Sequence, residues 1–300
     1  MLEFSQHQER VFFGMSAYFC FEGIPFHAIV HKREIIEESR DKFVIRDEDT
    51  VILSYPKSGT NWLIETVCLI QTKGNPKWIQ SVPVWQRSPW IETKKGFPIL
   101  INKEGPRLMS SHLPFHLFPK SFFRSKAKVI YIIRNPRDVL VSAYFFRHKI
   151  NLIDNPESLG TYFELFLKGN VTYGSWFEHT RNWLSMREND NFLLLSYEDM
   201  KKNTRGTIEK ICDFLGKKLE ADELDLVLKY SSFQAMKENK MSNFSLVPEH
   251  MVTNGLVLLR KGTTGDWKNH FTVAQAEAFD KVFQEKMAGF PPGLFPWKYP

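Results

Sequence analysis

The sequence predicts an α/β fold, in which a single domain has a central parallel sheet flanked by helices. Three short apolar runs carry this prediction, and each ends in a polar or charged turn that leads into an amphipathic stretch. The runs are Val51 to Tyr55, Val129 to Ile133 and Phe192 to Ser196. Strands that are separated by helical segments favour a parallel sheet with right-handed crossovers. A chain of 300 residues is long enough to form one such domain.

The turns after these three predicted strands carry the residues that we expect to bind a ligand. Ligands of open parallel sheets gather beyond the carboxyl ends of the strands. Lys57, Arg134 and Tyr197 follow the three runs. We therefore expect them to meet at one edge of the sheet.

The C-terminal part of the chain divides into a loop and a helix. Residues 235 to 260 have weak periodicity and mixed polarity, which predicts a long loop that orders over a substrate. Thr272 and Gln275 resemble a capping box, and they predict a helix from about Val273 to Met287.

Charge and composition narrow the class of partner. The chain has 40 Lys and Arg against 34 Asp and Glu, a formal charge of +6 that favours an anionic ligand. It has no dense basic run, so we expect no nucleic-acid partner. The aromatic fraction of 14% fits either an aromatic-lined binding site or a Phe-rich core.

The cysteines and the N-terminal residues indicate a cytoplasmic protein that does not enter a membrane. Cys20, Cys68 and Cys212 are odd in number, far apart and set among apolar residues, as buried thiols of a reducing compartment are. Charged residues precede the first apolar run and Glu22 interrupts it, which fits neither a signal peptide nor a membrane helix. We assign residues 1–20 to an N-terminal extension that is a candidate for disorder, and 21–300 to the domain.

The strongest chemical signal is YPKSGTNW, at residues 55–62, between a predicted strand and a predicted helix. Backbone N–H groups of such a turn and of the helix N-terminus bind phosphate, while Gly59 permits close approach and Lys57 adds a cation. The run is not a Walker A sequence, because GxxxxGK[ST] is absent. An ordinary strand-to-helix turn is the alternative.

With a second motif, this loop resembles the cytosolic sulfotransferases. YPKSGTNW is similar to their 5'-phosphosulfate loop, and RKGTTGDWKNHFT, at residues 260–272, is similar to the signature that holds the 3'-phosphate. Further blocks of similarity are FVIRDED (43–49), KWIQSVP (77–83), RSPW (87–90), SSHLP (110–114) and KAKVIYIIRNPRDVLVS (126–142). Their variants resemble the hydroxysteroid branch. The resemblance implies one α/β domain with a nucleotide-kinase-like phosphate-binding loop.

The resemblance also implies a binding site for 3'-phosphoadenosine-5'-phosphosulfate (PAPS), with the bisphosphate PAP as the product. The 5' end of the nucleotide would be held by Lys57, Ser58, Gly59, Thr60, Asn61 and Trp62. The 3'-phosphate would be held by Arg134, Ser142, Arg260, Lys261 and Gly262. The residues around adenine and ribose would be Tyr197, Ser231, Met236 and Trp62. For Ser231 and Met236 taken alone, a structural role is the alternative.

His112 occupies the position of the family's catalytic base. An alcohol is a poor nucleophile, and a neutral imidazole can take its proton. Lys57 would stabilise charge on the leaving group. A sulfuryl group carries less charge than a phosphoryl group, so we expect no metal. Without the resemblance, a lone His is more often structural.

Acceptor residues are implied by the hydroxysteroid branch. Trp85, Trp90 and Phe146 match residues that line its acceptor site, where flat aromatic walls suit sterol rings, although core packing is the alternative. Arg147 stands where we expect Trp, and Phe244 where we expect Tyr, so the choice of acceptor stays open. Arg147 either binds an anionic group of the acceptor or extends to solvent.

The segment KxxxTVxxxE, through which the family forms homodimers, is present as Lys268, Thr272, Val273 and Glu277. A solvated helix start is the alternative reading of these residues.

Two other functions fit part of the sequence. A small-molecule kinase would use the same phosphate loop and parallel sheet, but the Walker A run is absent. A steroid or lipid carrier would explain the aromatic content, but it has no use for His112 or a 3'-phosphate clamp. The sequence therefore favours a sulfotransferase that moves the sulfuryl group of PAPS to the hydroxyl of a steroid, bile acid or related alcohol.

Overall fold

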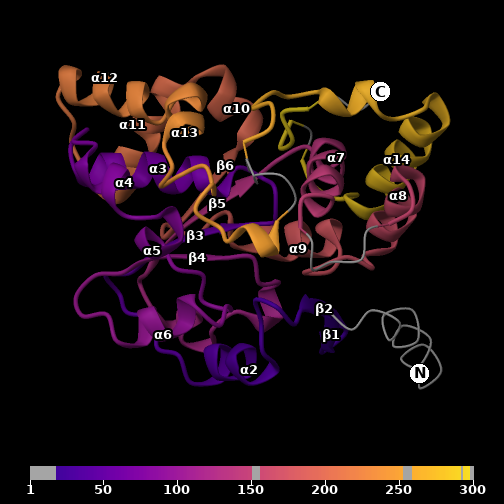
Figure 1. Ribbon diagram of the computed structural model, residues 1–300, viewed down its shortest axis with the longest axis horizontal. Helices are drawn as coiled ribbons and strands as arrows, with labels where there is room; N and C mark the ends of the chain where they lie inside the picture. The colour runs from indigo at the N-terminus through magenta and orange to yellow at the C-terminus, as the bar shows by residue number, and fades with distance from the viewer. Residues whose placement is uncertain (1–17, 151–155, 253–258, 292, 298–300) are drawn as a thin grey trace.

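The centre of the molecule is a four-stranded parallel sheet with the strand order β4-β3-β5-β6 (Figure 1). Its strands are β3 (Thr50–Ser54), β4 (Leu108–Ser111), β5 (Lys128–Ile133) and β6 (Phe192–Ser196). The computed structural model describes residues 18–150, 156–252, 259–291 and 293–297. The parallel sheet and the three predicted strands are confirmed. The sequence did not indicate β4, which is only four residues long.

Two apolar cores cover the two faces of the sheet. Ile52 and Ile130 face the core that includes α3 (Thr60–Gln71), α11 (Thr204–Leu215) and α12 (Ala221–Tyr230). The neighbouring residues along the strands face the other core, with α6 (Gly96–Ile101), α9 (Trp176–Trp183) and α14 (Val273–Lys286). Burial on both faces explains why the strands read as continuous apolar runs.

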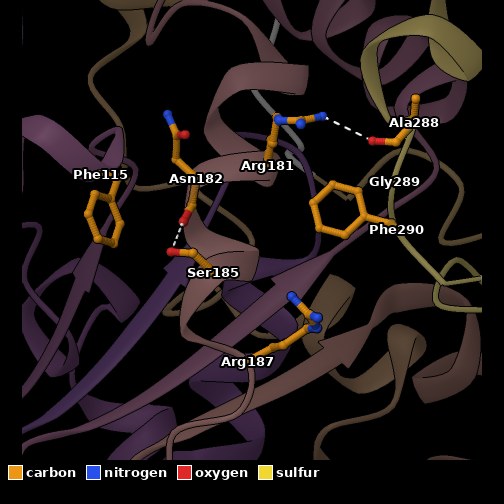
Figure 2. A pocket seen from close by; sticks show the side chains of 8 residues that line it. All are labelled: Phe115, Arg181, Asn182, Ser185, Arg187, Ala288, Gly289 and Phe290. Carbon is orange, nitrogen blue, oxygen red and sulfur yellow. Dashed lines mark hydrogen bonds between the residues drawn. The ribbon is translucent and has the colours of Figure 1, made fainter.

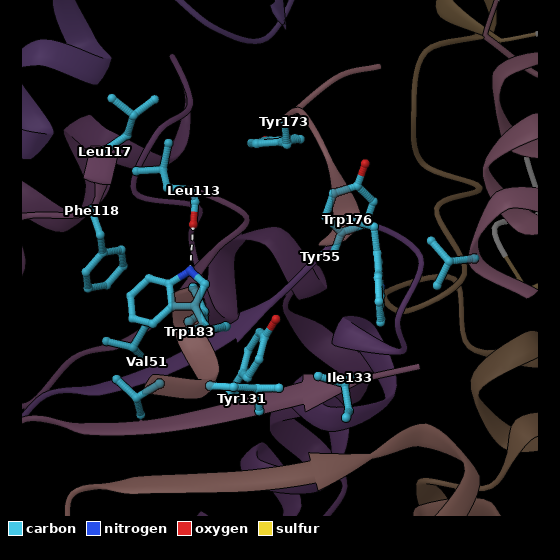
Figure 3. Close-up of a cluster of buried hydrophobic side chains, with 14 of the residues drawn as sticks. Val51, Tyr55, Leu113, Leu117, Phe118, Tyr131, Ile133, Tyr173, Trp176 and Trp183 are labelled. Carbon is cyan, nitrogen blue, oxygen red and sulfur yellow. Dashed lines mark hydrogen bonds between the residues drawn. The ribbon is translucent and has the colours of Figure 1, made fainter. Parts of the chain in front are cut away.

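Trp183 anchors the second of these cores, as Figure 3 shows. Its ring is fully buried and lies near Tyr131 of β5, with the ring centroids 6.3 Å apart. The indole N–H donates to the carbonyl oxygen of Leu113 over 3.1 Å. A buried indole needs such an acceptor, and here it fixes the backbone directly after His112.

The remaining elements surround this framework. The other α-helices of five or more residues in the described part of the chain are α2 (Arg33–Asp41), α4 (Lys77–Ser81), α7 (Pro136–Arg147), α8 (Leu159–Lys168), α10 (Tyr197–Lys202) and α13 (Phe233–Glu238). A four-residue helix, α5 (Val84–Arg87), follows α4. An antiparallel hairpin of β1 (Tyr18–Phe21) and β2 (Ile24–His27), which the sequence did not indicate, lies apart from the main sheet in Figure 1.

The boundaries of three predicted segments can be compared with the structure. Residues 18–20 of the predicted extension belong to β1, and residues 1–17 lie outside the described part. The predicted C-terminal helix is confirmed as α14, and Thr272 and Gln275 form both hydrogen bonds of a capping box.

The prediction of one loop over residues 235–260 is wrong at its start, because α13 extends to Glu238. The Ser232 side chain caps α13 by accepting from the Ala235 N–H, and residues 253–258 lie outside the description.

Cys68 and Cys212 are buried free thiols, and Cys20 is half-buried. Within the part of the chain that the structure describes, no helix has the length and apolar character needed to cross a bilayer.

Candidate active site

Each strand of the parallel sheet ends next to one chemically important side chain. Lys57 follows β3, His112 follows β4, Arg134 follows β5 and Tyr197 follows β6. The structure thus brings together the three residues predicted from strand ends and adds His112, whose strand the sequence did not indicate. Convergence at the carboxyl edge is how open parallel sheets form binding sites.

The loop between β3 and α3 has the form of an anion cradle. Lys57 has a φ of +70° and Gly59 a φ of +104°. A Cβ atom on Gly59 would lie 2.7 Å from the Tyr197 ring, so a side chain there has no room. Among the described residues, no side chain caps the N-terminus of α3, and none forms a hydrogen bond with the buried hydroxyl of Ser58. Open N–H groups and an unpaired buried hydroxyl fit a bound anion such as a phosphate.

Arg134 connects this loop to the second predicted motif. Its Nη1 donates to the carbonyl oxygen of Lys57 over 2.9 Å, and its Nη2 donates to the carbonyl oxygen of Thr263 over 3.1 Å. Its guanidinium carbon also lies 4.3 Å from the Tyr197 ring centroid. Tyr197 in turn packs edge-on against Trp62, with a centroid distance of 5.5 Å. The two predicted nucleotide-binding motifs therefore form one site.

Asp266 organises the second motif. Its carboxylate accepts from Arg260 and from Lys261, each over 2.6 Å. Burial opposes the charge of Asp266, but hydrogen bonds from Lys261, Asn269 and Arg260 hold its pKa well below the usual range. The Asp138 carboxylate of α7 accepts from the N–H groups of Gly265 and Trp267, which fixes the loop on α7. The cations predicted to bind a phosphate are thus already gathered.

The other predicted nucleotide contacts lie at different depths. Ser142 is half-buried on α7, three residues before Phe145, whose ring lies 4.7 Å from the Arg260 guanidinium carbon. Ser231 is fully buried, and its hydroxyl donates to the Val227 carbonyl oxygen over 2.7 Å. Met236 is buried in α13.

Gly262 sits tightly against α13. A Cβ atom on Gly262 would lie 2.2 Å from the ring of Phe233, and its φ is +66°. Only glycine fits this contact without a rearrangement.

His112 has the tautomer that a general base needs. Its Nδ1 lies 2.7 Å from the carbonyl oxygen of Ser54, so Nδ1 must carry the proton that it donates. The free lone pair is then on Nε2. Burial lowers the pKa of His112 to about 4, with Lys57 acting in the same direction and the Ser54 hydrogen bond opposing it. His112 is therefore a neutral proton acceptor near pH 7.

Lys57, the lysine of the loop between β3 and α3, has a lowered pKa. Its Nζ lies 4.0 Å from the centroid of the Phe146 ring. Burial, followed by the positive charges of Arg134 and Arg260, lowers the pKa of Lys57 to about 7. A neighbouring anion would restore the charged form, so the site is electrostatically prepared for a negative ligand.

The predicted acceptor residues differ in the residues that they contact. Trp90 lies beside His112, with ring centroids 5.9 Å apart, and Phe146 lies against Lys57 as described above. Trp85 packs edge-on against Phe244, at a centroid distance of 5.3 Å. Arg147 instead turns to the N-terminal hairpin, where its Nη1 donates to the Tyr18 hydroxyl over 2.7 Å.

Glu92 and Asp266 are site residues that sequence reasoning missed. Asp266 stands inside the RKGTTGDWKNHFT motif, whose spacing from Arg260 could have suggested it. Glu92 accepts from the backbone N–H of His112 over 2.8 Å, although the two are twenty positions apart. No local pattern could have indicated that contact. Among the described residues, no group of three or more His, Cys, Asp or Glu gathers as metal ligands do.

A separate surface pocket with a volume of about 380 Å³ contains none of the predicted site residues (Figure 2). Its lining consists of Phe115, Arg181, Asn182, Ser185, Arg187, Ala288, Gly289 and Phe290. Arg181 donates there to the carbonyl oxygens of Lys286 and Ala288. These contacts satisfy the C-terminal end of α14, which indicates a structural role.

Comparisons with known proteins agree with this geometry. The family model of the sulfotransferase domain matches residues 47–291. "Sulfotransferase 2A1" of Mus musculus is 76% identical over 284 residues, which cover 95% of this chain and 100% of that relative. "3-beta-hydroxysteroid sulfotransferase" of Cavia porcellus is 64% identical over 93% of this chain and 97% of its own length.

Among solved structures, mouse sulfotransferase SULT7A1 complexed with PAP superposes with a TM-score of 0.78. It is 32% identical, and the match covers 91% of this chain and 95% of that chain. The family model and these relatives span nearly the whole domain. The chain belongs to the sulfotransferase family.

Proposed function

We propose that this protein transfers the sulfuryl group of PAPS to the hydroxyl group of a hydroxysteroid. The observation that carries the proposal is the bridge that Arg134 makes between the Lys57 loop and the loop of Arg260. PAPS has anionic groups on both its 5' and 3' sides, and each of these loops offers a cationic site to one of them. Relatives named as hydroxysteroid sulfotransferases support the acceptor class.

The residues of the site divide the work of the reaction. When bound, PAPS supplies the sulfuryl group. Nε2 of His112 takes the proton of the acceptor hydroxyl, since its Nδ1 is occupied by Ser54. Lys57 regains its charge beside the bound anion and stabilises the charge that remains on the nucleotide. We propose that no metal takes part, because a sulfuryl group carries less charge than a phosphoryl group.

The acceptor lies, in this proposal, against Trp90, Phe146 and Trp85. Trp90 and Phe146 pack beside the base and the cationic loop, respectively, which supports their role as apolar walls. We further propose that Arg147 favours acceptors with an anionic group, such as bile acids. Such a group would give the guanidinium, which donates to the Tyr18 hydroxyl in the structure, a charge-assisted contact.

We also propose a cytoplasmic homodimer. The segment Lys268, Thr272, Val273 and Glu277 is exposed, and Val273 retains 76% of its accessible surface. An exposed valine at a helix start is a suitable contact for a second copy, although the segment is small. The buried free thiols of Cys68 and Cys212 support a reducing compartment.

Calorimetric titration with PAP and with ADP, both without magnesium, tests the nucleotide class. PAP carries a 3'-phosphate that ADP lacks, so the parent should bind PAP much more tightly. Arg260→Ala should lose about 1.5 to 3 kcal/mol of PAP affinity while ADP affinity stays unchanged. Arg205→Ala, which removes an exposed arginine with a surface partner, is the control. Equal affinity for PAP and ADP in the parent would overturn the proposal.

A further inference from the structure

Glu92 lies directly behind the catalytic base. Its segment runs beside β4, where the Ile91 N–H donates to the Ser110 carbonyl oxygen over 3.0 Å. The Glu92 side chain is fully buried, and its Oε1 accepts from the His112 backbone N–H over 2.8 Å. A group in this place can control where the imidazole of His112 stands.

Two further buried groups extend this contact away from His112. The Tyr173 hydroxyl lies 3.2 Å from Oε1 of Glu92 and 2.8 Å from Nε2 of His31. Nδ1 of His31 lies 3.0 Å from the carbonyl oxygen of His27. The Tyr173 ring also packs edge-on against the His112 ring, with the centroids 5.3 Å apart. Glu92 and Tyr173 therefore hold His112 from its backbone and from its ring.

Counting donors shows how many protons this chain needs. The His27 carbonyl can only accept, so Nδ1 of His31 carries a proton and Nε2 of a neutral His31 is an acceptor. Tyr173 has one hydroxyl proton, which it then gives to His31. Its oxygen can complete the contact with Glu92 only if Glu92 donates from Oε1, the same oxygen that accepts from the His112 N–H. With Glu92 ionised and His31 neutral, one of these buried contacts would set two lone pairs against each other, which is costly.

We propose that Glu92, Tyr173 and His31 form a buried chain that shares one proton, that Glu92 holds this proton at neutral pH, and that the chain positions His112 for catalysis. The other arrangement with the same number of protons has an ionised Glu92 and a charged His31. Burial opposes this charged arrangement at both ends, because burial raises the pKa of Glu92 to about 7 and lowers the pKa of His31 to about 3.

The hydrogen bonds around the chain oppose burial at both ends but do not outweigh it. The groups that face Glu92 are the His112 N–H, the Ser111 hydroxyl and the Tyr173 hydroxyl, whose hydrogen bonds lower its pKa less than burial raises it. For His31, burial lowers the pKa, the hydrogen bond to the His27 carbonyl oxygen raises it, and the nearby His112 and Lys94 lower it further. Among the described residues, the groups that favour the charged forms of Glu92 and His31 are outweighed by burial at both ends.

Three variants separate the proton-sharing chain from simple packing. Gln at position 92 imitates the uncharged carboxyl group, since its amide oxygen can still accept from the backbone N–H of His112 while the side chain carries no charge. We expect Glu92→Ala to lower kcat by up to about 100-fold through misplacement of the base. Glu92→Gln should restore most of that loss, and PAP affinity should stay the same in both. Glu104→Gln, at an exposed site, is the control for removing a carboxylate.

Spectroscopy provides a readout that does not depend on turnover. Difference infrared spectra of the parent against Glu92→Gln at pH 6 should contain the carbonyl band of a protonated carboxyl group, which fades by pH 9. The Glu104→Gln difference spectrum should lack it. Nitrogen-15 spectra, assigned with His31→Gln, should give a neutral His31 protonated on Nδ1.

Two results would overturn the inference: a parent without this carboxyl band, or a Glu92→Gln enzyme as slow as Glu92→Ala. The kinetic part rests on the proposed sulfuryl transfer, whereas the spectra do not. A parent that fails to transfer sulfuryl groups would count against the proposed function, and the band would still decide the shared proton.

Discussion

Nδ1 of His112 lies 2.7 Å from the carbonyl oxygen of Ser54, the last residue of β3. The Ser54 hydroxyl also lies 2.6 Å from the Thr60 hydroxyl at the start of α3. Ser54 therefore fixes the tautomer of the base and, at the same time, contacts the loop that we propose to hold PAPS. This places the base and the anion cradle in a fixed relation, which a transfer between two bound molecules requires.

Replacement of the base should affect turnover without affecting nucleotide binding. We expect His112→Ala to lower kcat by a factor of about 10² to 10⁴, because only the acceptor's proton is handled by Nε2. Calorimetry should give the same PAP affinity as in the parent. His116→Ala is a matched control, because His116 is exposed four residues further on. Near-parental turnover in His112→Ala would require another base.

Nucleotide binding should draw protons from solution near neutral pH. The pKa of Lys57 is lowered to about 7 in the free site, so much of Lys57 is neutral at pH 7 to 8. A bound anion raises this pKa, and Lys57 then takes up a proton. Accordingly, PAP affinity should fall as the pH rises through about 7, because restoring the charge becomes harder.

Binding enthalpies measured in buffers of different ionisation enthalpy report this uptake. Lys57→Met should lose most of it, whereas Lys218→Met, at a side chain that is 89% exposed, should not. Uptake that persists unchanged in Lys57→Met would assign the proton to a different group.

Arg147 should set the preference for charged acceptors. We expect Arg147→Trp to lower the ratio of kcat/KM for a bile acid to kcat/KM for its neutral side-chain alcohol by about tenfold, the effect of one charge-assisted contact. Lys149→Trp alters an exposed neighbouring cation and should leave the ratio unchanged. The same ratio in the parent and in Arg147→Trp would mean that Arg147 remains on the Tyr18 hydroxyl during catalysis.

A buried ion pair between α3 and α5 should contribute to stability. Oε2 of Glu65 lies 2.7 Å from Nη2 of Arg87, and both side chains are fully buried. Glu65→Ala leaves an uncompensated buried guanidinium, so the free energy of unfolding should fall by about 3 to 5 kcal/mol. Urea titration measures this, with Glu104→Ala as the exposed control. A loss below about 1 kcal/mol would mean that this buried pair contributes no more to stability than an exposed ion pair does.

The sequence predicted those parts of the fold that repeat a local pattern. β3, β5 and β6 are buried on both faces, so each appears as a continuous apolar run. α14 could be located because Thr272 and Gln275 are the two halves of one capping box. β4 has only four residues, with the sequence LMSS. Two of them are serines, and both serines are buried by tertiary contacts although they are polar. No periodicity marks such a strand.

The site was predictable where a motif is contiguous and not where the fold assembles it. The Lys57 loop follows one predicted strand, and its Gly59 and Lys57 could be interpreted directly from the sequence. Glu92 reaches His112 only because the fold places Trp90 next to Ser110 of β4. The contact between Arg147 and Tyr18 could not be predicted from the sequence either, because no sequence pattern indicated the hairpin that contains Tyr18.

The most direct test of the central claim uses PAPS labelled in its sulfuryl group, a panel of hydroxysteroids and bile acids, and an excess of EDTA. We expect label to pass to the hydroxyl of at least one acceptor at a rate that EDTA does not change, and His112→Ala to lose nearly all of that transfer. The account would be contradicted if no acceptor took up label, or if EDTA abolished transfer and added magnesium restored it.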